Sequence, residues 1–551
     1  MGNFFKIFSV SLSFLLLWEA DARSYTVAKQ QLIKVGNATE PKDLDPATVT
    51  GTPESHILDN LFEGLMAYQP RTLDPIPGVA ESWSVSADGK VYTFKLRKNA
   101  RWSDGVEVTA QDFVYSWIRA LSPKTASEYA YQLFYVKNGE AFNAGKIKDP
   151  TQVGIKALDK YTLQVSLENP TPFFVRLTSF HTYYPVPPHV VEKEGKEWTK
   201  EGKLVSNGPF KLKEWKLNRH IHLARNEHYW DKEAVMMNEV IFYPVENTDT
   251  EEKMFVAGDL HMTSTVPTLK VPFYQSKMKQ NPNQYQIYKN VPNLAVYFYR
   301  FNVRKKPMDD PRVRRALALT VDRKLIVERV TRGGQLPAGS FTPTVAGYFY
   351  QGQHTLPVSV TPEAIAEAKK LLKDAGYEDP KTMPKIELLY NTNEAHKQIA
   401  IAIQQMWNKN LGVEVELFNQ EWKVYLDSEN KGNFNVSRAG WVGDYPDPNT
   451  FLDMFVTNGG NNKTGWSNKD YDKMIDMAAE TLDQAKRFDY FQKAEDLLLT
   501  ELPILPIYFY TQQKLISEDV RMLEEGKITE WYDNITDRLL YKYYVLVDVK
   551  K

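Results

Sequence analysis

The segment from residue 361 to residue 417 alternates helical and strand patterns, and this alternation limits the fold to the α/β class. Thr361 can cap a helix whose first position suits Pro362, apolar residues then recur at helical spacing, and Gly376 ends the helix. Three elements follow, namely a strand at 386–390, a helix at 396–410 and a strand at 413–417. This order predicts a βαβ unit with a parallel pair of strands.

The first third of the chain mixes the same two patterns. Residues 91–96 are β-branched and aromatic, and residues 161–167 alternate apolar with polar, so both are predicted strands. Residues 109–118 place their apolar side chains on one helical face. Because 551 residues exceed what one core supports, about three domains are expected, or two lobes of which one is subdivided.

The first 22 residues are predicted to be a signal peptide. An apolar run at 8–18 is too short to span a bilayer and is followed by a small-x-small cleavage pattern, so the mature chain should begin near Arg23. The chain contains no cysteine, which excludes disulfides, thiolate metal sites and a lipidated N-terminal cysteine. A secreted chain without a lipid anchor is expected in a periplasm.

Charge and motifs exclude several classes of function. Lys+Arg 68 against Asp+Glu 69 gives no reason to expect a nucleic acid partner. No nucleophile elbow, HExxH zinc motif, phosphate loop or dinucleotide fingerprint occurs, so no enzyme, cofactor or metal site is predicted. His220 and His222 could offer two imidazoles to a metal, but without a third ligand they are interpreted as polar edge positions on a surface strand.

The segment RAGWVGDYPDP at 438–448 is the strongest candidate site. It places a cation, an aromatic ring and carboxylates after a predicted strand at 434–436, where α/β proteins place ligand groups. Asp444 could there receive an ammonium group. The alternative is a turn in which Asp444 and Asp447 cap their own backbone, and composition alone leaves both open.

Many ordered motifs resemble the oligopeptide-binding proteins of ABC importers, which are large solute-binding proteins of family 5. The motifs span nearly all of the mature chain. They are LDP (44–46), LFEGL (61–65), PGVAESW (77–83), FKLRKNARWSDG (94–105), VTAQDFVYSW (108–117), NGPF (207–210), YWD (229–231), RVR (312–314), DR (322–323) and RAGWVGDYPD (438–447).

The resemblance implies a periplasmic-binding-protein-like α/β fold with two lobes, a hinge and an extra third domain. Hinge crossings are expected near residues 294 and 511. The implied parts are lobe I at 23–63, 187–294 and 512–551, domain II at 64–186 and lobe III at 295–511. Closure of the lobes would bury a short peptide, which a monomer would deliver to the permease subunits of an importer.

The resemblance also implies roles for particular residues. Asp444 resembles the aspartate that receives the α-ammonium of the peptide. Arg438 and His396 resemble positions that hold the ligand's C-terminal carboxylate. The remaining implied peptide-binding aromatics are Tyr129, Trp422, Trp441 and Tyr445.

Three positions depart from the family pattern. Thr50 and Arg300 stand where glutamates are expected, and Glu429 stands where arginine is expected. The change should disfavour basic ligand side chains and favour acidic groups, although Glu429 partly offsets it. The WVGDY form at 441–445 is similar to the murein-peptide branch, so a murein peptide is an alternative ligand. A haem or metal-chelate binder on the same fold is a further alternative, but it needs no carboxylate opposite an α-amine.

Overall fold

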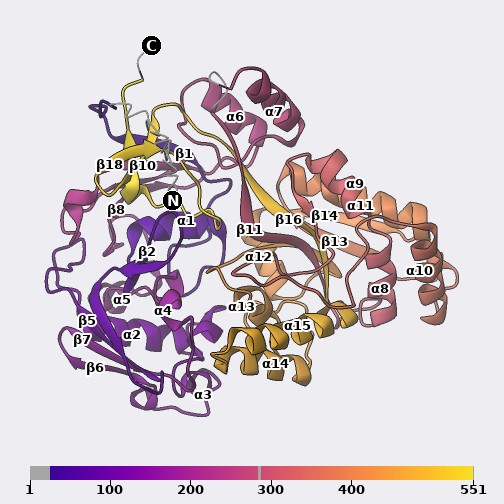
Figure 1. Cartoon of the computed structure of the whole chain (residues 1–551), viewed down its shortest axis with the longest axis horizontal. Helices are drawn as coiled ribbons and strands as arrows, with labels where there is room; N and C mark the ends of the chain where they lie inside the picture. The colour runs from indigo at the N-terminus through magenta and orange to yellow at the C-terminus, as the bar shows by residue number, and fades with distance from the viewer. Residues whose placement is uncertain (1–24, 283–286, 550–551) are drawn as a thin grey trace, which may run out of the picture.

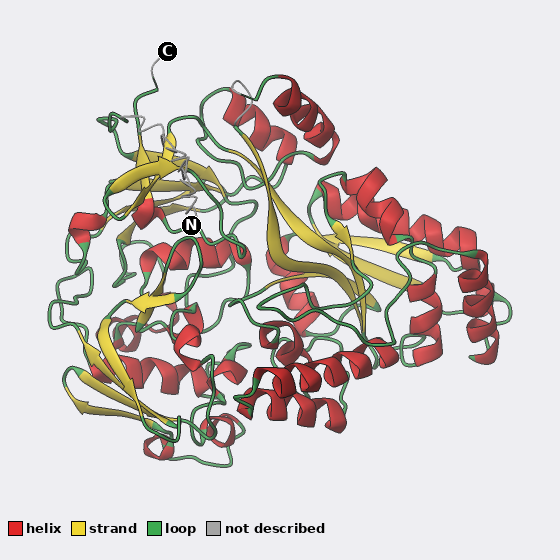
Figure 2. Ribbon diagram, in the orientation of Figure 1, coloured by secondary structure: helices red, strands yellow, loops and turns green. Residues whose placement is uncertain are grey.

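The computed structural model describes residues 25–282 and 287–549, so the predicted signal peptide and its cleavage site near Arg23 lie outside the described residues. Figure 1 shows two lobes: the first contains both ends of the described chain, and the second contains most of its middle part. Helices and strands occur in both (Figure 2), which confirms the mixed α/β content predicted from the sequence.

Within the described residues, the first lobe contains three sheets of three or four strands and one two-stranded sheet. The strands of the three larger sheets, in spatial order, are β1 (Leu32–Gly36), β10 (Glu239–Tyr243), β9 (His220–Arg225) and β8 (Phe210–Lys216); β18 (Lys527–Glu530), β17 (Val520–Glu524) and β19 (Tyr544–Leu546); and β4 (Ala80–Val85), β5 (Val91–Leu96), β7 (Thr162–Ser166) and β6 (Ile155–Asp159). A short hairpin joins β2 (Met66–Tyr68) to β3 (Pro75–Pro77). One core contains both Ile33 and Leu546, so the two ends of the chain fold together.

The second lobe is built on one six-stranded sheet. Its strands, in order, are β12 (Leu336–Pro337), β16 (Ile504–Leu515), β11 (Tyr288–Phe301), β15 (Val436–Val442), β13 (Ile386–Asn391) and β14 (Val415–Gln420). β13 and β14 are parallel and are connected by α11 (Glu394–Leu411), as the predicted βαβ unit requires. The alternating helix and strand patterns of the sequence therefore predict this βαβ unit correctly.

Local sequence signals mark where the principal helices begin and end. Thr361 Oγ1 accepts a hydrogen bond from Ala364 N at the start of α10, and Gly376 follows its end at φ +94°. The helices of nine or more residues not yet introduced, together with α10, are α1 (Thr52–Leu61), α2 (Ala110–Leu121), α6 (Thr248–Val256), α7 (Val271–Gln280), α8 (Pro311–Leu319), α10 (Pro362–Asp374), α12 (Trp422–Asn430), α14 (Lys469–Glu480) and α15 (Gln484–Glu501).

Two long antiparallel strands, β11 and β16, cross from one lobe to the other (Figure 1). Their pairing is regular from Tyr288 to Pro292 and shifts register before Val296. A bulge of this kind interrupts the ladder and bends the strand. The interruption coincides with the predicted hinge crossing near residue 294, while the domain boundaries given above stay predictions.

Two expectations about strands are wrong. The strand predicted at 434–436 begins at Val436 and extends to Val442, so Arg438 and Trp441 lie on the strand itself and not in the following turn. His220 and His222 lie on β9, which is flanked by β10 and β8 and is not an edge. His220 Nε2 lies 2.6 Å from Glu214 Oε2, and within the described ranges no three acidic or histidine side chains could hold a metal ion.

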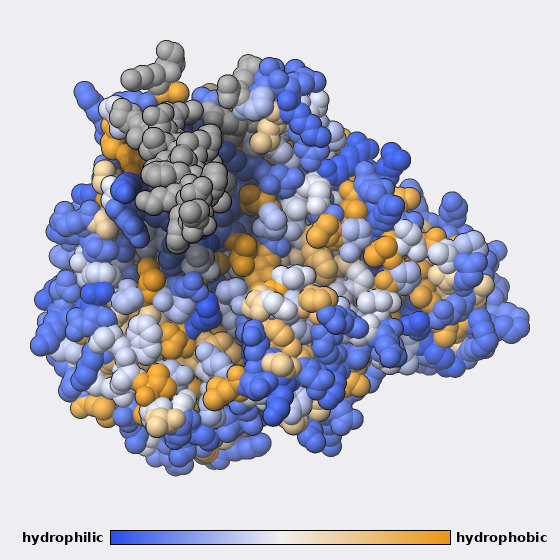
Figure 3. All heavy atoms as spheres, viewed as in Figure 1, coloured by the Kyte–Doolittle hydropathy of each residue, from blue (hydrophilic) through white to orange (hydrophobic). Residues whose placement is uncertain are grey.

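Among the described residues, no helix is long and apolar enough to cross a membrane. On the face drawn in Figure 3, hydrophilic residues cover most of the periphery, and apolar ones are more frequent where the two lobes meet.

Replacing Trp407 by Ala should lower the free energy of unfolding by about 3–5 kcal/mol, because the indole is fully buried and its Nε1–H donates to Leu317 O at 2.9 Å. Urea unfolding followed by circular dichroism measures this loss. Phe418→Ala in the same lobe is the control, since Phe418 is 50% exposed and should cost no more than about 0.5 kcal/mol. Equal losses for both variants would contradict the assigned core.

Candidate functional site

A cavity lies between the two lobes. About 510 Å³ of space that no protein atom occupies, open solvent included, lies between its lining residues. The first lobe contributes the start of α1 and a C-terminal segment, and the second lobe contributes the end of β15 and the residues after it. The lining residues are Thr50, Thr52, Ser55, His56, Asp59, Tyr129, Phe180, Gly440, Trp441, Val442, Gly443, Asp444, Thr536, Asp537 and Arg538.

Asp444 places a carboxylate in this cavity, two residues after the end of β15. Its Oδ1 accepts a hydrogen bond from the Tyr129 hydroxyl at 3.3 Å, and its Oδ2 accepts one from Gln132 Nε2 at 2.8 Å. Both donors are neutral and come from the first lobe. The Asp444 amide donates to Thr450 Oγ1 at 3.0 Å, so the backbone fixes the direction of the side chain. The carboxylate does not cap its own turn.

Asp444 is 6% exposed, and it has no salt-bridge partner among the described residues. Burial raises the pKa of its carboxyl to about 7, although the nearby Arg538 guanidinium and the Tyr129 hydroxyl oppose the rise. Arg538 is itself engaged, because its Nη1 lies 2.9 Å from both carboxylate oxygens of Asp59. The site therefore favours a cation that a ligand would bring.

Aromatic rings surround the carboxylate. The Tyr129 ring lies 6.0 Å from the Trp441 ring and 5.2 Å from the Phe180 ring, and all three residues line the cavity. Trp422 lies apart from this group, on α12, and its ring stacks on Tyr425 at 5.6 Å. Trp422 Nε1 donates across the cleft to Glu54 Oε1 at 3.3 Å, close to Thr50 in sequence.

Arg438 and His396 form a second polar group. Arg438 Nη2 donates to the Tyr510 hydroxyl at 2.7 Å, its Nη1 lies 3.3 Å from Asn391 Oδ1, and its Nε has no hydrogen-bond partner in the described chain. The guanidinium lies 4.7 Å from the centre of the Tyr297 ring, which also contacts His396 at 5.6 Å. Burial and Arg438 lower the pKa of His396, so the imidazole is neutral. No carboxylate within the described residues pairs with Arg438.

Arg300 and Glu429 bind each other. Arg300 Nη1 lies 2.8 Å from both carboxylate oxygens of Glu429, and Ser437 Oγ donates to the same carboxylate at 2.8 Å. Both side chains are buried. The two charged departures from the family pattern thus form one ion pair, and Arg300 Nη1 is not a free cation for an acidic ligand.

Tyr445 points away from the cavity. Its ring stacks on Phe173 at 5.5 Å, and its hydroxyl accepts a hydrogen bond from Asn449 Nδ2 at 3.0 Å. The adjacent Asp447 does cap its own turn, since its Oδ1 accepts from Asn449 N, and it forms two 2.7 Å contacts with Arg487. The turn alternative thus holds for Asp447.

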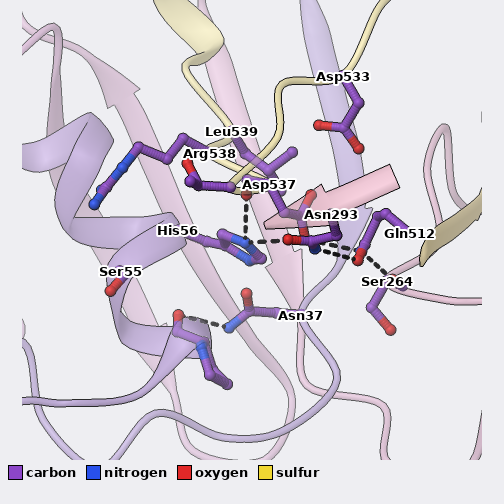
Figure 4. A network of polar contacts seen from close by, with 12 residues as sticks. Asn37, Ser55, His56, Ser264, Asn293, Gln512, Asp533, Asp537, Arg538 and Leu539 are labelled. Atoms are coloured by element: carbon purple, nitrogen blue, oxygen red, sulfur yellow. Dashed lines mark hydrogen bonds and ion pairs between the residues drawn. The ribbon is translucent and has the colours of Figure 1, made fainter. Parts of the chain in front are cut away.

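Sequence reasoning missed the residues that connect the cavity to the hinge (Figure 4). His56 Nε2 lies 3.0 Å from Asp537 O, and because a carbonyl can only accept, this nitrogen carries the proton. Asp537 Oδ2 accepts from Gln512 Nε2 at 2.8 Å, and Gln512 Oε1 accepts from Asn293 Nδ2 at 3.1 Å. Asn293 and Gln512 lie on the two crossing strands, so side chains bridge the interrupted ladder. No local motif marks these positions.

Comparisons with known proteins agree with this geometry. The chain matches the family described as bacterial extracellular solute-binding proteins, family 5 Middle, over residues 74–463. The periplasmic murein peptide-binding protein MppA of Escherichia coli (strain K12) is 42% identical over 511 residues, which are 92% of each chain. The periplasmic oligopeptide-binding protein OppA of Salmonella typhimurium is 40% identical over 498 residues, which are 89% of this chain and 88% of that one.

Comparison with solved structures indicates how the two lobes are arranged relative to each other. The E. coli murein tripeptide binding protein MppA has a TM-score of 0.88 at 40% identity, and Haemophilus influenzae OppA in complex with RPPGFSPFR has 0.88 at 35%, each covering 95% of this chain and 100% of that one. MppA in its unliganded open form has a TM-score of only 0.63 at 39% identity, and the match covers 96% of this chain and 99% of that one. Because identity barely differs between the two MppA forms, the lower score reflects lobe placement, and the present lobes are closed. The chain belongs to family 5 of the bacterial extracellular solute-binding proteins and has their two-lobed periplasmic-binding fold.

Proposed function

We propose that this chain captures short peptides in the cleft between its lobes and delivers them to the permease of an ABC-type importer. The observation that carries the proposal is Asp444, a buried carboxylate in the cavity that has no ion-pair partner among the described residues. The α-ammonium of a peptide supplies that cation. The relatives named as peptide-binding proteins support the same class of ligand.

Arg438 supports a ligand with an anion at its other end. Asp444 follows Arg438 by six residues, which is about 20 Å along an extended chain. The side chains shorten this span, so it suits a peptide of a few residues. A free peptide carries opposite charges at its two termini, and Arg438 on β15 and Asp444 two residues after β15 provide the complementary pair.

The edge of β15 can bind the backbone of such a ligand. β11 pairs with all of β15, whereas β13 pairs with it through Val436 and Ser437 only. The residues after Ser437 therefore leave one edge toward the cavity, which Gly440 to Gly443 line. Strand addition at this edge would use groups that every peptide possesses, and side-chain identity would matter little.

The finer features of the proposal come from the sequence and its resemblance to the family. The chain would act in the periplasm as a binding protein and not as an enzyme, without a lipid anchor, as a monomer that contacts the permease subunits of its importer. A murein peptide is the alternative ligand, and the names of the E. coli relative and its structure favour including it.

Native purification from a periplasm, followed by release and mass spectrometry of the bound material, tests the proposal. A series of mixed short peptides is the expected result. A single diaminopimelate-containing species would assign the murein alternative, and a haem or metal chelate would contradict peptide binding.

Asp444→Asn should weaken binding of a free tripeptide by about 3–5 kcal/mol, because the α-ammonium would be buried without an anion. Calorimetry measures the loss. The N-acetylated form of the same peptide is the control, since it brings no ammonium and should lose much less in the variant. Equal losses for both peptides would contradict the role of Asp444.

Acidification should favour closure of the empty lobes. The Asp444 pKa is about 7 when the cleft is closed and empty, and it should return to the ordinary value of 3.8 when the cleft opens. The closed form then binds the proton more tightly, so closure costs up to about 4 kcal/mol above pH 7 and this cost is lost as the pH falls toward 4. Small-angle scattering of the ligand-free protein across this range measures the closed fraction. Asp444→Asn should be more closed at neutral pH and respond weakly, and an equally pH-dependent variant would contradict the assignment.

A further inference from the structure

The lobes also contact each other at Glu128, which lies in the first lobe next to the cavity residue Tyr129. The loop at 458–464 of the second lobe packs against it. Glu128 Oε2 accepts from Lys463 Nζ at 2.6 Å, and Glu128 Oε1 accepts from Asn430 Nδ2 at 3.0 Å. The side chains of Glu128 and Lys463 are 18% and 13% exposed, so closure removes most of their solvent.

Gly460 allows the backbones of the two lobes to meet. A Cβ atom at this position would lie 2.0 Å from Glu128 O, 2.6 Å from its carbonyl carbon and 2.7 Å from its Cα. These atoms belong to the backbone, so no side-chain rotation relieves the overlap. Any other residue at 460 must hold the lobes apart at this point.

Charge pairing at this contact depends on closure. Burial lowers the pKa of Lys463, and Glu128 opposes this shift. In an open cleft both groups would be separated and hydrated. When the lobes close, Lys463 needs Glu128, because a buried cation without its partner is costly.

We propose that Glu128, Asn430, Gly460 and Lys463 form an interlobe latch that stabilises the closed state independently of the ligand. None of the four is among the residues that line the cavity. The free energy of these contacts contributes to the closing equilibrium, which is part of every binding constant. The latch should therefore change the affinity for all peptides by the same factor. This inference rests on the proposed peptide binding and goes beyond it.

Gly460→Ala tests the latch, and Gly459→Ala is the matched control. At Gly459 the three atoms nearest to a Cβ would belong to Val456 and Met454 of the same lobe, at 3.1–3.7 Å. Calorimetry with two peptides of different length and sequence measures affinity, thermal unfolding measures stability, and small-angle scattering with saturating peptide measures closure.

We expect Gly460→Ala to weaken binding of both peptides by the same factor of at least about tenfold, with an unchanged unfolding temperature. The Gly459→Ala affinities should equal those of the wild type. Unchanged affinity in Gly460→Ala, or factors that differ between the peptides, would overturn the latch. If the wild type binds neither peptide, the proposed function fails instead.

A second variant avoids steric change. Glu128→Gln keeps the size of the side chain and removes its charge. It should weaken the binding of both peptides equally, by about threefold to tenfold. Combining it with Lys463→Met should cost less than the sum of the single changes, because the two charges act as one pair. Additive losses would show that Glu128 and Lys463 act separately and would overturn the charged part of the latch.

Discussion

The rest of the closed structure depends on one buried carboxylate. Asp444 receives two hydrogen bonds from neutral donors, and the nearest guanidinium, that of Arg538, is bound to Asp59. An anion in this position makes the closed and empty cleft expensive at neutral pH. A ligand that carries an ammonium group removes the penalty, so the energy that opposes closure without ligand becomes the energy that drives closure with it.

Four cations near the cleft are each paired with a carboxylate. Arg300 binds Glu429, Arg487 binds Asp447, Arg538 binds Asp59 and Lys463 binds Glu128. Among the described charged residues of the site, Asp444, Arg438 and Glu54 have no such partner, and burial raises the pKa of Glu54, which favours its neutral form. Ligand termini therefore meet complementary charges, whereas ligand side chains meet charges that are already neutralised. This pairing argues against the preference for acidic side chains that the sequence suggested, because Glu429 neutralises Arg300.

Local signals predicted the elements of the second lobe well, and long-range contacts explain what they missed. The cap at Thr361 and the βαβ order from residue 386 depend on near neighbours, so the sequence contains the signal. β15 was predicted too short because Arg438 and Gly440 interrupt its apolar pattern, while its pairing partner, β11, lies about 140 residues earlier. Gln132 and Arg538 reach Asp444 over 312 and 94 residues, and no spacing rule covers such distances. The assignment of Asp444 itself came from a family resemblance, since composition left a capped turn equally open.

The free energy of closure combines a contribution that depends on the ligand with contributions that do not. In the proposed binding mode, the Asp444 carboxylate would distinguish a ligand with a free amine from one without it, because only a cation compensates its charge. The contact between Gly460 and the Glu128 backbone, and the hydrogen bonds from Asn293 through Gln512 to Asp537, are made by the protein alone. If the proposed latch is right, these contacts would contribute to the free energy of closure before any side chain of the ligand is considered. A cleft built in this way can bind peptides of many sequences with similar geometry, since the ligand supplies the missing charge and the protein supplies the rest of the closed interface.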